Sequence, residues 1–117
     1  MSTKSFEAQV RQQSGVAIVD LYGEIEAFAE DGLNAAYAEA ESQGTEAILF
    51  NFSGIDYINS TGIALIVGLL AQARKSSRRL LACGLSDHYV EIFQITRLVD
   101  FMSIFPDEDS ALAGIHS

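Results

Sequence analysis

The 117-residue sequence has one cysteine, one proline, no tryptophan and few basic residues. The lone cysteine, Cys83, excludes a disulfide within the chain and is typical of a reducing compartment. Its neighbours Leu80, Leu81 and Ala82 predict a buried thiol. Only 7 Lys and Arg residues stand against 16 Asp and Glu residues, so the formal net charge is −9. This balance argues against a nucleic-acid partner, because binding to phosphates needs clustered cations.

The sequence also lacks a long hydrophobic segment. The longest apolar stretch, Gly62–Ala71, is much shorter than the roughly 20 residues of a membrane-spanning helix. Residues 1–13 contain no apolar segment of the kind found in secretory signals. We therefore expect a cytoplasmic protein with no membrane association.

Ligand-binding motifs are scarce as well. Cys83, His88 and His116 have no spacing typical of metal ligands, and no Gly-Lys-Ser/Thr phosphate loop occurs. The sequence predicts no metal and no cofactor. Nucleotide binding near Glu26 and Ser60 stays open at this level.

What is present is a regular alternation of apolar segments. Strands are expected at Phe6–Arg11, Val16–Tyr22, Ala47–Phe52, Arg79–Gly84 and within Leu98–Phe105; helices are expected at Ala27–Gln43, Thr61–Ser76, Asp87–Thr96 and Asp107–Ala113. Two strands followed by alternating helices and strands predict an α/β fold, with a mixed sheet of about five strands and helices mostly on one face. With no linker visible, residues 1–117 are expected to form a single domain.

Turn signals separate these segments. The link Gln13–Gly15 predicts a hairpin turn, and Gly44 stands where a helix would end. Apolar residues recur at helical spacing in the first predicted helix; they are Phe28, Leu33, Ala36 and Tyr37. Residues 53–62 are rich in Ser, Asn, Asp and Gly, and we expect them to form a loop.

The segment Asn59-Ser60-Thr61-Gly62 carries the most functional information. Short polar side chains at a helix start bind the free amides of the first turn, where positive partial charge tolerates an anion. A phosphate on Ser60 could therefore be accommodated, and Gly62 allows another chain to approach the backbone closely.

The helix after Ser60 is too apolar for a simple surface helix. One stripe at helical spacing is expected to face the sheet; it comprises Ile63, Ile66, Val67 and Leu70. Leu65 and Leu69 fall on another side of the helix. They form either an exposed apolar ridge for a partner or a face covered by a neighbouring helix.

Four segments together resemble the STAS family, and in particular bacterial anti-sigma-factor antagonists. They are Leu21–Glu26, Ile48–Ile63 with the Asn-Ser-Thr-Gly motif, Leu80–Leu85 and Ile92–Phe101. The resemblance covers nearly the whole chain. It implies a STAS-type domain that binds an anti-sigma factor with serine-kinase activity, and so controls transcription without being an enzyme.

The resemblance also assigns site residues. Ser60 matches the phosphorylated serine; phosphorylation releases the kinase partner, and a PP2C-type phosphatase reverses it. Glu26 matches an acidic position near the site, and Thr61 the second hydroxyl position. The partner-binding residues implied are Glu26, Asn59, Ser60, Thr61, Gly62, Leu65 and Leu69.

Asn59 departs from the family pattern, which usually has Asp at this position. Asn caps a helix about as well as Asp, so the local structure is expected to survive. The site loses one negative charge beside the phosphoacceptor, which lowers repulsion toward a phosphate. This leaves open a partner switch that involves no sigma factor.

Other classes of function are weighed against this one. Ser60, His88 and Asp87 or Asp100 supply the side-chain types of a catalytic triad, but no Gly-x-Ser-x-Gly elbow surrounds Ser60. The other histidine, His116, is next to the last residue of the sequence. A scaffold subunit of a larger STAS assembly and a transporter-associated STAS partner keep the same fold and remain alternatives.

Overall fold

A five-stranded sheet forms the centre of the structure, a computed structural model that describes residues 5–115. The strands are β1 (Glu7–Gln13), β2 (Val16–Ile25), β3 (Ala47–Ile58), β4 (Arg79–Cys83) and β5 (Ser103–Phe105). They lie side by side in sequence order; β1 is antiparallel to β2, and the other neighbours are parallel. The predicted mixed sheet is confirmed. The ends of the expected domain, residues 1–4 and 116–117 with His116, lie outside the described residues.

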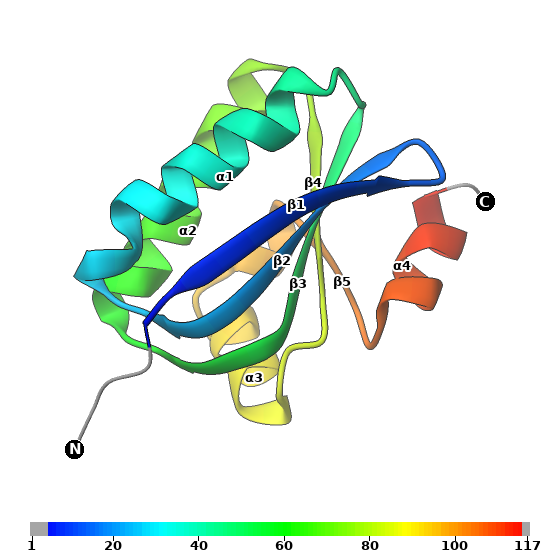
Figure 1. Cartoon of the computed structure of the whole chain (residues 1–117). Coiled ribbons are helices and arrows are strands. Elements are labelled where there is room, and N and C mark those ends of the chain that lie inside the picture. The colour runs from blue at the N-terminus through cyan, green and yellow to red at the C-terminus, as the bar shows by residue number, and fades with distance from the viewer. Residues whose placement is uncertain (1–4, 116–117) are drawn as a thin grey trace.

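Helices cover the two faces of the sheet unequally (Figure 1). They are η1 (Ala27–Ala29), α1 (Glu30–Ser42), α2 (Ser60–Lys75), α3 (Asp87–Ile95), η2 (Leu98–Asp100) and α4 (Glu108–Ile115). The larger core lies between the sheet and α1, α2 and α3, whereas only α4 packs on the other face. Helices therefore lie mostly on one face, as expected. Within residues 5–115, no helix combines the length and apolar character needed to cross a membrane.

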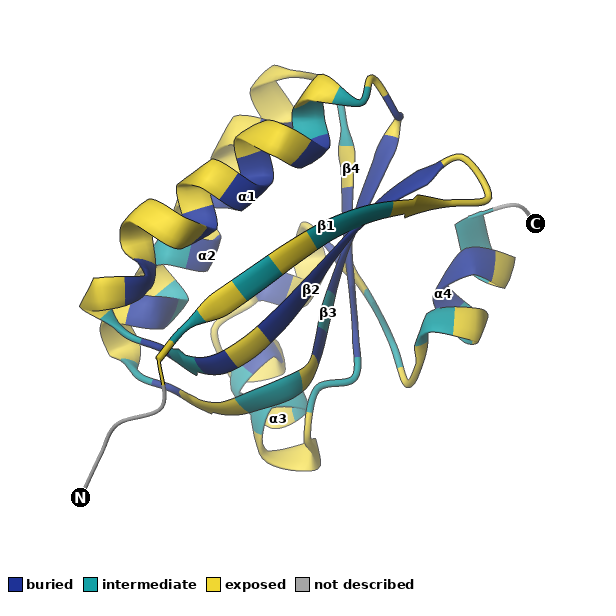
Figure 2. Ribbon diagram, viewed as in Figure 1, coloured by how far each residue is buried: buried dark blue, intermediate teal, exposed yellow. Residues whose placement is uncertain are grey.

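The local sequence explains most of these elements. Ser14 and Gly15 adopt positive φ angles of 54° and 77°, which is the geometry of a tight turn between twisted antiparallel strands. The predicted hairpin is thus confirmed. In α1, Leu33 and Tyr37 are buried one turn apart, and Figure 2 shows the buried side of α1 turned toward the sheet.

The predicted loop at residues 53–62 is largely wrong. β3 continues to Ile58, because its polar second half pairs with the second half of β2, up to the pair Ile25 and Ile58. The register shifts twice along this pairing, between Asp20 and Tyr22 and between Gly23 and Glu24. Backbone pairing with an existing strand therefore outweighs a local composition that favours turns. The longer strand carries the chain directly to the start of α2.

A buried polar group ties the less covered face of the sheet together. Asp20 accepts hydrogen bonds from Arg11 Nε (2.7 Å) and from Asn51 Nδ2 (2.9 Å). Arg11 also binds Glu108, so β1, β2 and α4 share one ionic contact. The hydrogen bond from Arg11, helped by that from Asn51, holds the pKa of Asp20 below its usual value against the opposing effect of burial.

Cys83 lies beside this group, and its thiol is buried as predicted. Burial is the main cause that raises the pKa of the Cys83 thiol to about 11, and nearby acidic groups are the second. A thiol with such a pKa is almost entirely protonated at neutral pH, so it acts as a core side chain.

The lowered pKa of Asp20 predicts a defined pH dependence of stability. The stabilisation is complete above the unfolded-state pKa of about 4, and it is lost as the pH falls through the lower folded-state pKa. We expect Asp20→Asn to lower the free energy of unfolding by about 1–3 kcal/mol at neutral pH. Urea unfolding from about pH 7 to about pH 3 measures the effect; the difference between variant and parent should shrink on acidification. A difference that stays constant over this range contradicts the assignment.

Candidate functional site

The functional site is built where β2 and β3 end and α2 begins. Asn59 is extended (φ −91°, ψ −177°), and its side-chain Oδ1 accepts a hydrogen bond from Gly62 N at 2.8 Å. Its backbone N–H donates to the carbonyl of Ile25, the last residue of β2, at 3.2 Å. Asn59 therefore caps α2, as predicted, and also attaches the start of the helix to the end of β2.

Gly62 brings the first turn of α2 against the end of β2. A Cβ atom at this position would lie 2.2 Å from the Ile25 carbonyl oxygen and 2.8 Å from Ile58 Cγ2. Neither neighbour is the end of a flexible side chain, so only glycine fits without a backbone shift. The expected approach of another chain at Gly62 needs correction: Gly62 is buried, and the close approach is made by the backbone of its own chain at Ile25.

Ser60 and Thr61 are exposed at the head of this locked helix, and Glu26 is half-buried immediately after Ile25. Within the described part of the chain, the Ser60 hydroxyl makes no hydrogen bond. The structure thus gathers the predicted residues Glu26, Asn59, Ser60, Thr61 and Gly62 around one junction. Ser60 and Thr61 supply its exposed hydroxyl groups.

The predicted faces of α2 need correction. Leu69 is only 2% exposed and packs in the main core, and Leu65 is half-buried against it, so these two residues do not form an exposed ridge. Val67, which was expected to face the sheet, is 47% exposed. The buried stripe instead comprises Gly62, Ile66, Leu69, Leu70 and Ala73. Almost every residue of this helix is apolar, so helical spacing alone could not identify the inner face; the contact of Gly62 with Ile25 fixes it.

One exposed aromatic residue was missed. Phe28 lies in η1, two residues after Glu26, and is 96% exposed, although the sequence pattern groups it with the buried Leu33, Ala36 and Tyr37. The chain enters α1 through the short helix η1, and this change of geometry turns Phe28 away from the core. Because η1 follows Ile25 closely and packs against α2, Phe28 belongs to the segment beside the head of α2. The sequence predicts one helix from Ala27, whereas the structure has a short 3-10 helix, η1, before α1.

A hollow of about 390 Å³ adjoins Ser60 on the side of α3, and its lining includes Ile63, Tyr89 and His88. The Tyr89 hydroxyl accepts a hydrogen bond from Ile58 N at 2.8 Å and donates to Ile58 O at 3.3 Å, which holds the end of β3 in place.

The side chains of the alternative triad are not assembled. His88 packs on the ring of Tyr89, with 4.8 Å between ring centroids, and no hydrogen bond joins it to Ser60 in residues 5–115. Asp100 pairs instead with Arg97 Nε at 2.7 Å. Among the described side chains, no group of three or more His, Cys, Asp or Glu residues could hold a metal ion.

The junction predicts opposite effects for alanine at two glycines of α2. Gly62→Ala should lower the free energy of unfolding by about 1–3 kcal/mol, because its Cβ forces apart two backbone segments. Gly68→Ala is the matched control: its Cβ would meet no atom within 4 Å. It should raise the stability by about 0.5–1 kcal/mol through helix propensity. Urea unfolding measures both; a Gly62→Ala variant as stable as Gly68→Ala contradicts the close contact.

Comparison with known proteins places this geometry in a family. Residues 7–111 match the family model of the STAS domain. The chain is 30% identical over 86 residues to the anti-sigma-B factor antagonist of Staphylococcus aureus. The aligned region covers 74% of this chain and 80% of that protein. The chain therefore belongs to the STAS domain family, and curated relatives that it matches carry the name of anti-sigma-factor antagonists.

Solved structures show the same fold. An anti-sigma factor antagonist from Mycobacterium paratuberculosis superimposes with a TM-score of 0.83 at 18% identity, covering 97% of this chain and 96% of that one. The Bacillus cell fate determinant SpoIIAA in its phosphorylated form gives a TM-score of 0.69 at 21% identity, covering 95% of this chain and 99% of that one. The predicted α/β STAS fold is confirmed.

Proposed function

We propose that this chain is a cytoplasmic anti-sigma-factor antagonist that acts by binding. In its unmodified form it binds an anti-sigma factor with serine-kinase activity through the head of α2 and the adjacent η1. Phosphorylation of Ser60 releases this partner, and a PP2C-type phosphatase restores binding. One observation carries the proposal: Ser60 is exposed, with its hydroxyl unbonded, at the first position of a helix whose start is fixed by Asn59 and Gly62.

The position of Ser60 explains how a phosphate could act without refolding the domain. The first amides of a helix have no partner within the helix and carry positive partial charge, so they tolerate a phosphate nearby. The phosphate would add about −1.5 to −2 charges at neutral pH. The fold that the phosphorylated form of SpoIIAA shares with this chain supports such a local effect.

The surface around Ser60 supports a protein partner. Phe28 is an almost fully exposed aromatic ring, and large rings of this kind often anchor protein interfaces. Along α2, the exposed side beyond Thr61 carries Ala64 and Gly68, which allow close approach of a partner because Ala64 has a small side chain and Gly68 has none. A phosphate in the middle of such a contact would need to be desolvated, which opposes binding.

Substitution of Ser60 tests the switch. With the cognate anti-sigma factor and ATP, mass spectrometry should find phosphate on Ser60 of the parent. Ser60→Ala should bind that partner as the parent does. Ser60→Asp should bind at least tenfold more weakly, and the full phosphate should weaken binding by a few hundred-fold, about 3–4 kcal/mol. Isothermal titration calorimetry measures the affinities.

Thr61→Ala is the control for this experiment, because Thr61 is an exposed hydroxyl residue next to Ser60. It should remain a substrate of the kinase, with phosphate on Ser60. Equal affinities of the Ser60→Ala and Ser60→Asp variants for the partner contradict the proposal. Phosphate found on Thr61 rather than on Ser60 contradicts it as well.

Phe28→Ala tests the extent of the partner surface. Because the ring is 96% exposed, its removal should leave the free energy of unfolding within about 0.5 kcal/mol of the parent. It should nevertheless weaken partner binding about tenfold or more, since a buried interface anchor is lost. Phe101→Ala, at the other end of α2, is the control and should bind normally. If calorimetry shows the same affinity for Phe28→Ala and the parent, η1 lies outside the interface.

A further inference from the structure

The basic residues of this acidic chain are gathered at one end of the molecule. Every Lys and Arg except Lys4 and Arg11 lies at the end of α2, at the start of β4 or just after α3. They are Arg74, Lys75, Arg78, Arg79 and Arg97. This end of the molecule is therefore rich in positive charge, although the chain as a whole has a net charge of −9.

Only some of these cations are available to a ligand. Arg78 donates to the carbonyl of Thr45 and lies 3.7 Å from Glu41, so it holds the segment after α1. Arg97 pairs with Asp100. In the described part of the chain, neither Arg74 nor Arg79 pairs with a carboxylate.

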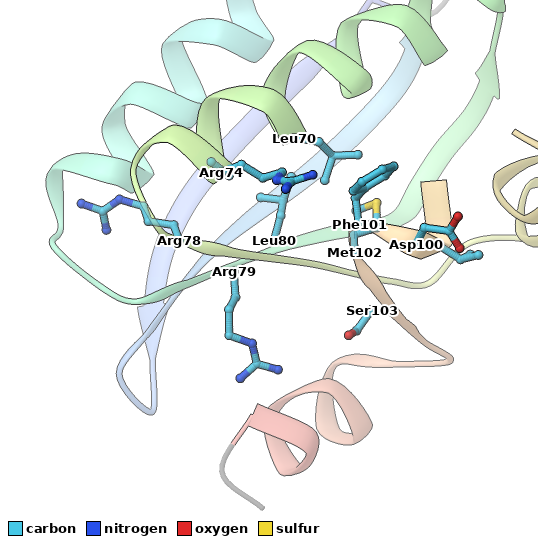
Figure 3. Close-up of a pocket in the computed structure, with 11 residues that line it drawn as sticks. Leu70, Arg74, Arg78, Arg79, Leu80, Asp100, Phe101, Met102 and Ser103 are labelled. Carbon is cyan, nitrogen blue, oxygen red and sulfur yellow. The ribbon is translucent and has the colours of Figure 1, made fainter. Parts of the chain in front are cut away.

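These two cations flank a groove built from two adjoining hollows, of about 300 Å³ and about 270 Å³. The hollows share Leu70, Arg74 and Phe101. The guanidinium carbon of Arg74 lies 5.3 Å from the centre of the Phe101 ring, and Figure 3 shows the two side chains close together, with Arg78 directed away from them. The Phe101 ring is 53% exposed, so an aromatic surface remains open beside the cation.

Other residues that line the two hollows add further apolar surface to the groove. Val67 and Val99 are 47% and 39% exposed, and each lines one of the two hollows. Arg79 and Leu80 precede Leu81, the first residue of β4 to pair with β5, so the groove extends along the start of β4. The part of the groove beside Val67 and Phe101 is thus mainly apolar, and Arg74 stands next to it from α2. Arg79 lines the outer end of the groove, and its side chain is directed to the other side of β4, toward α4 (Figure 3).

We propose that this groove, which we call the Arg74–Phe101 groove, is a second docking surface that binds an acidic segment with large apolar side chains from a partner protein. Charge complementarity selects this occupant: a carboxylate would pair with Arg74, while apolar side chains would cover Phe101, Val67 and Val99. The strongly acidic remainder of the chain opposes the long phosphate backbone of a nucleic acid.

The position of the groove separates it from the Ser60 switch. Arg74 lies near the C-terminal end of α2, 14 residues and roughly 21 Å along the helix axis from Ser60. Docking there is therefore independent of phosphorylation. A partner held in this groove would stay attached in both states of Ser60.

A random peptide library displayed on phage tests this proposal with the full chain as bait. The enriched peptides should combine Asp or Glu with aromatic or large aliphatic residues. Their affinity should fall about tenfold or more in Arg74→Ala and in Phe101→Ala, and it should weaken with added salt. Lys75→Ala is the matched control, because Lys75 is an exposed cation of the same helix end that does not line the groove.

Several outcomes overturn the proposal. These are the absence of enriched peptides, enrichment of basic or purely apolar peptides, and equal binding to Arg74→Ala and the parent. Stronger binding of duplex DNA or of anionic lipid vesicles would assign the groove to another class of partner. A concentration-dependent dimer in sedimentation, lost in Arg74→Ala, would assign it to a second copy of this chain.

The same peptides separate this proposal from the one for Ser60. Ser60→Asp and Phe28→Ala should bind them as the parent does. If Ser60→Asp loses the anti-sigma factor but keeps the peptides, both proposals stand. If it loses both, the groove is part of the switch surface and its independence is refuted.

Discussion

The close approach of Gly62 to the carbonyl of Ile25 is the contact on which the site depends. It presses the first turn of α2 against the end of β2, and it leaves room for no side chain at position 62. The amide of Asn59 donates to the same carbonyl, and its side chain caps Gly62. The Gly62 contact, the Asn59 amide bond and the Asn59 cap together fix where the helix begins and how it is rotated about its axis.

That rotation decides which groups reach the surface. With Gly62 turned inward, Leu69 and Leu70 follow it into the core, and Ser60, Thr61 and Val67 remain outside. The exposed serine is therefore a consequence of packing on the opposite side of the helix. A modification there can change the charge of the surface while the sheet and the core keep their contacts, which is the behaviour that a binding switch needs.

Much of this arrangement was predictable from the sequence, because turn residues and apolar periodicity act locally. The order of strands and helices, the cap at Asn59 and the position of Ser60 follow from such signals. The extension of β3 to Ile58 was not predictable, since it depends on pairing with β2, which is distant in sequence.

The faces of α2 were misassigned for a related reason. Small residues such as Gly62 and Ala73 lie in the buried stripe, yet hydrophobic periodicity gives them little weight. The full exposure of Phe28 depends on the short helix η1, and the groove beside Arg74 depends on residues from α2, β4 and the segment after α3. Contacts between distant segments create both features, so neither could be read from a single stretch of sequence.

The two ends of α2 give the domain two chemically different surfaces. Near Ser60 the surface is acidic and apolar, with Glu26 and Phe28, whereas at the other end Arg74 stands beside an apolar groove. The central claim concerns the first surface: a phosphate on Ser60 acts locally. Comparison of ¹⁵N–¹H correlation spectra of the unmodified and Ser60-phosphorylated chains tests it most directly. The account predicts shifts confined to residues 59–63 and the adjoining residues 25–28; shifts spread across β4 and α4 would contradict it.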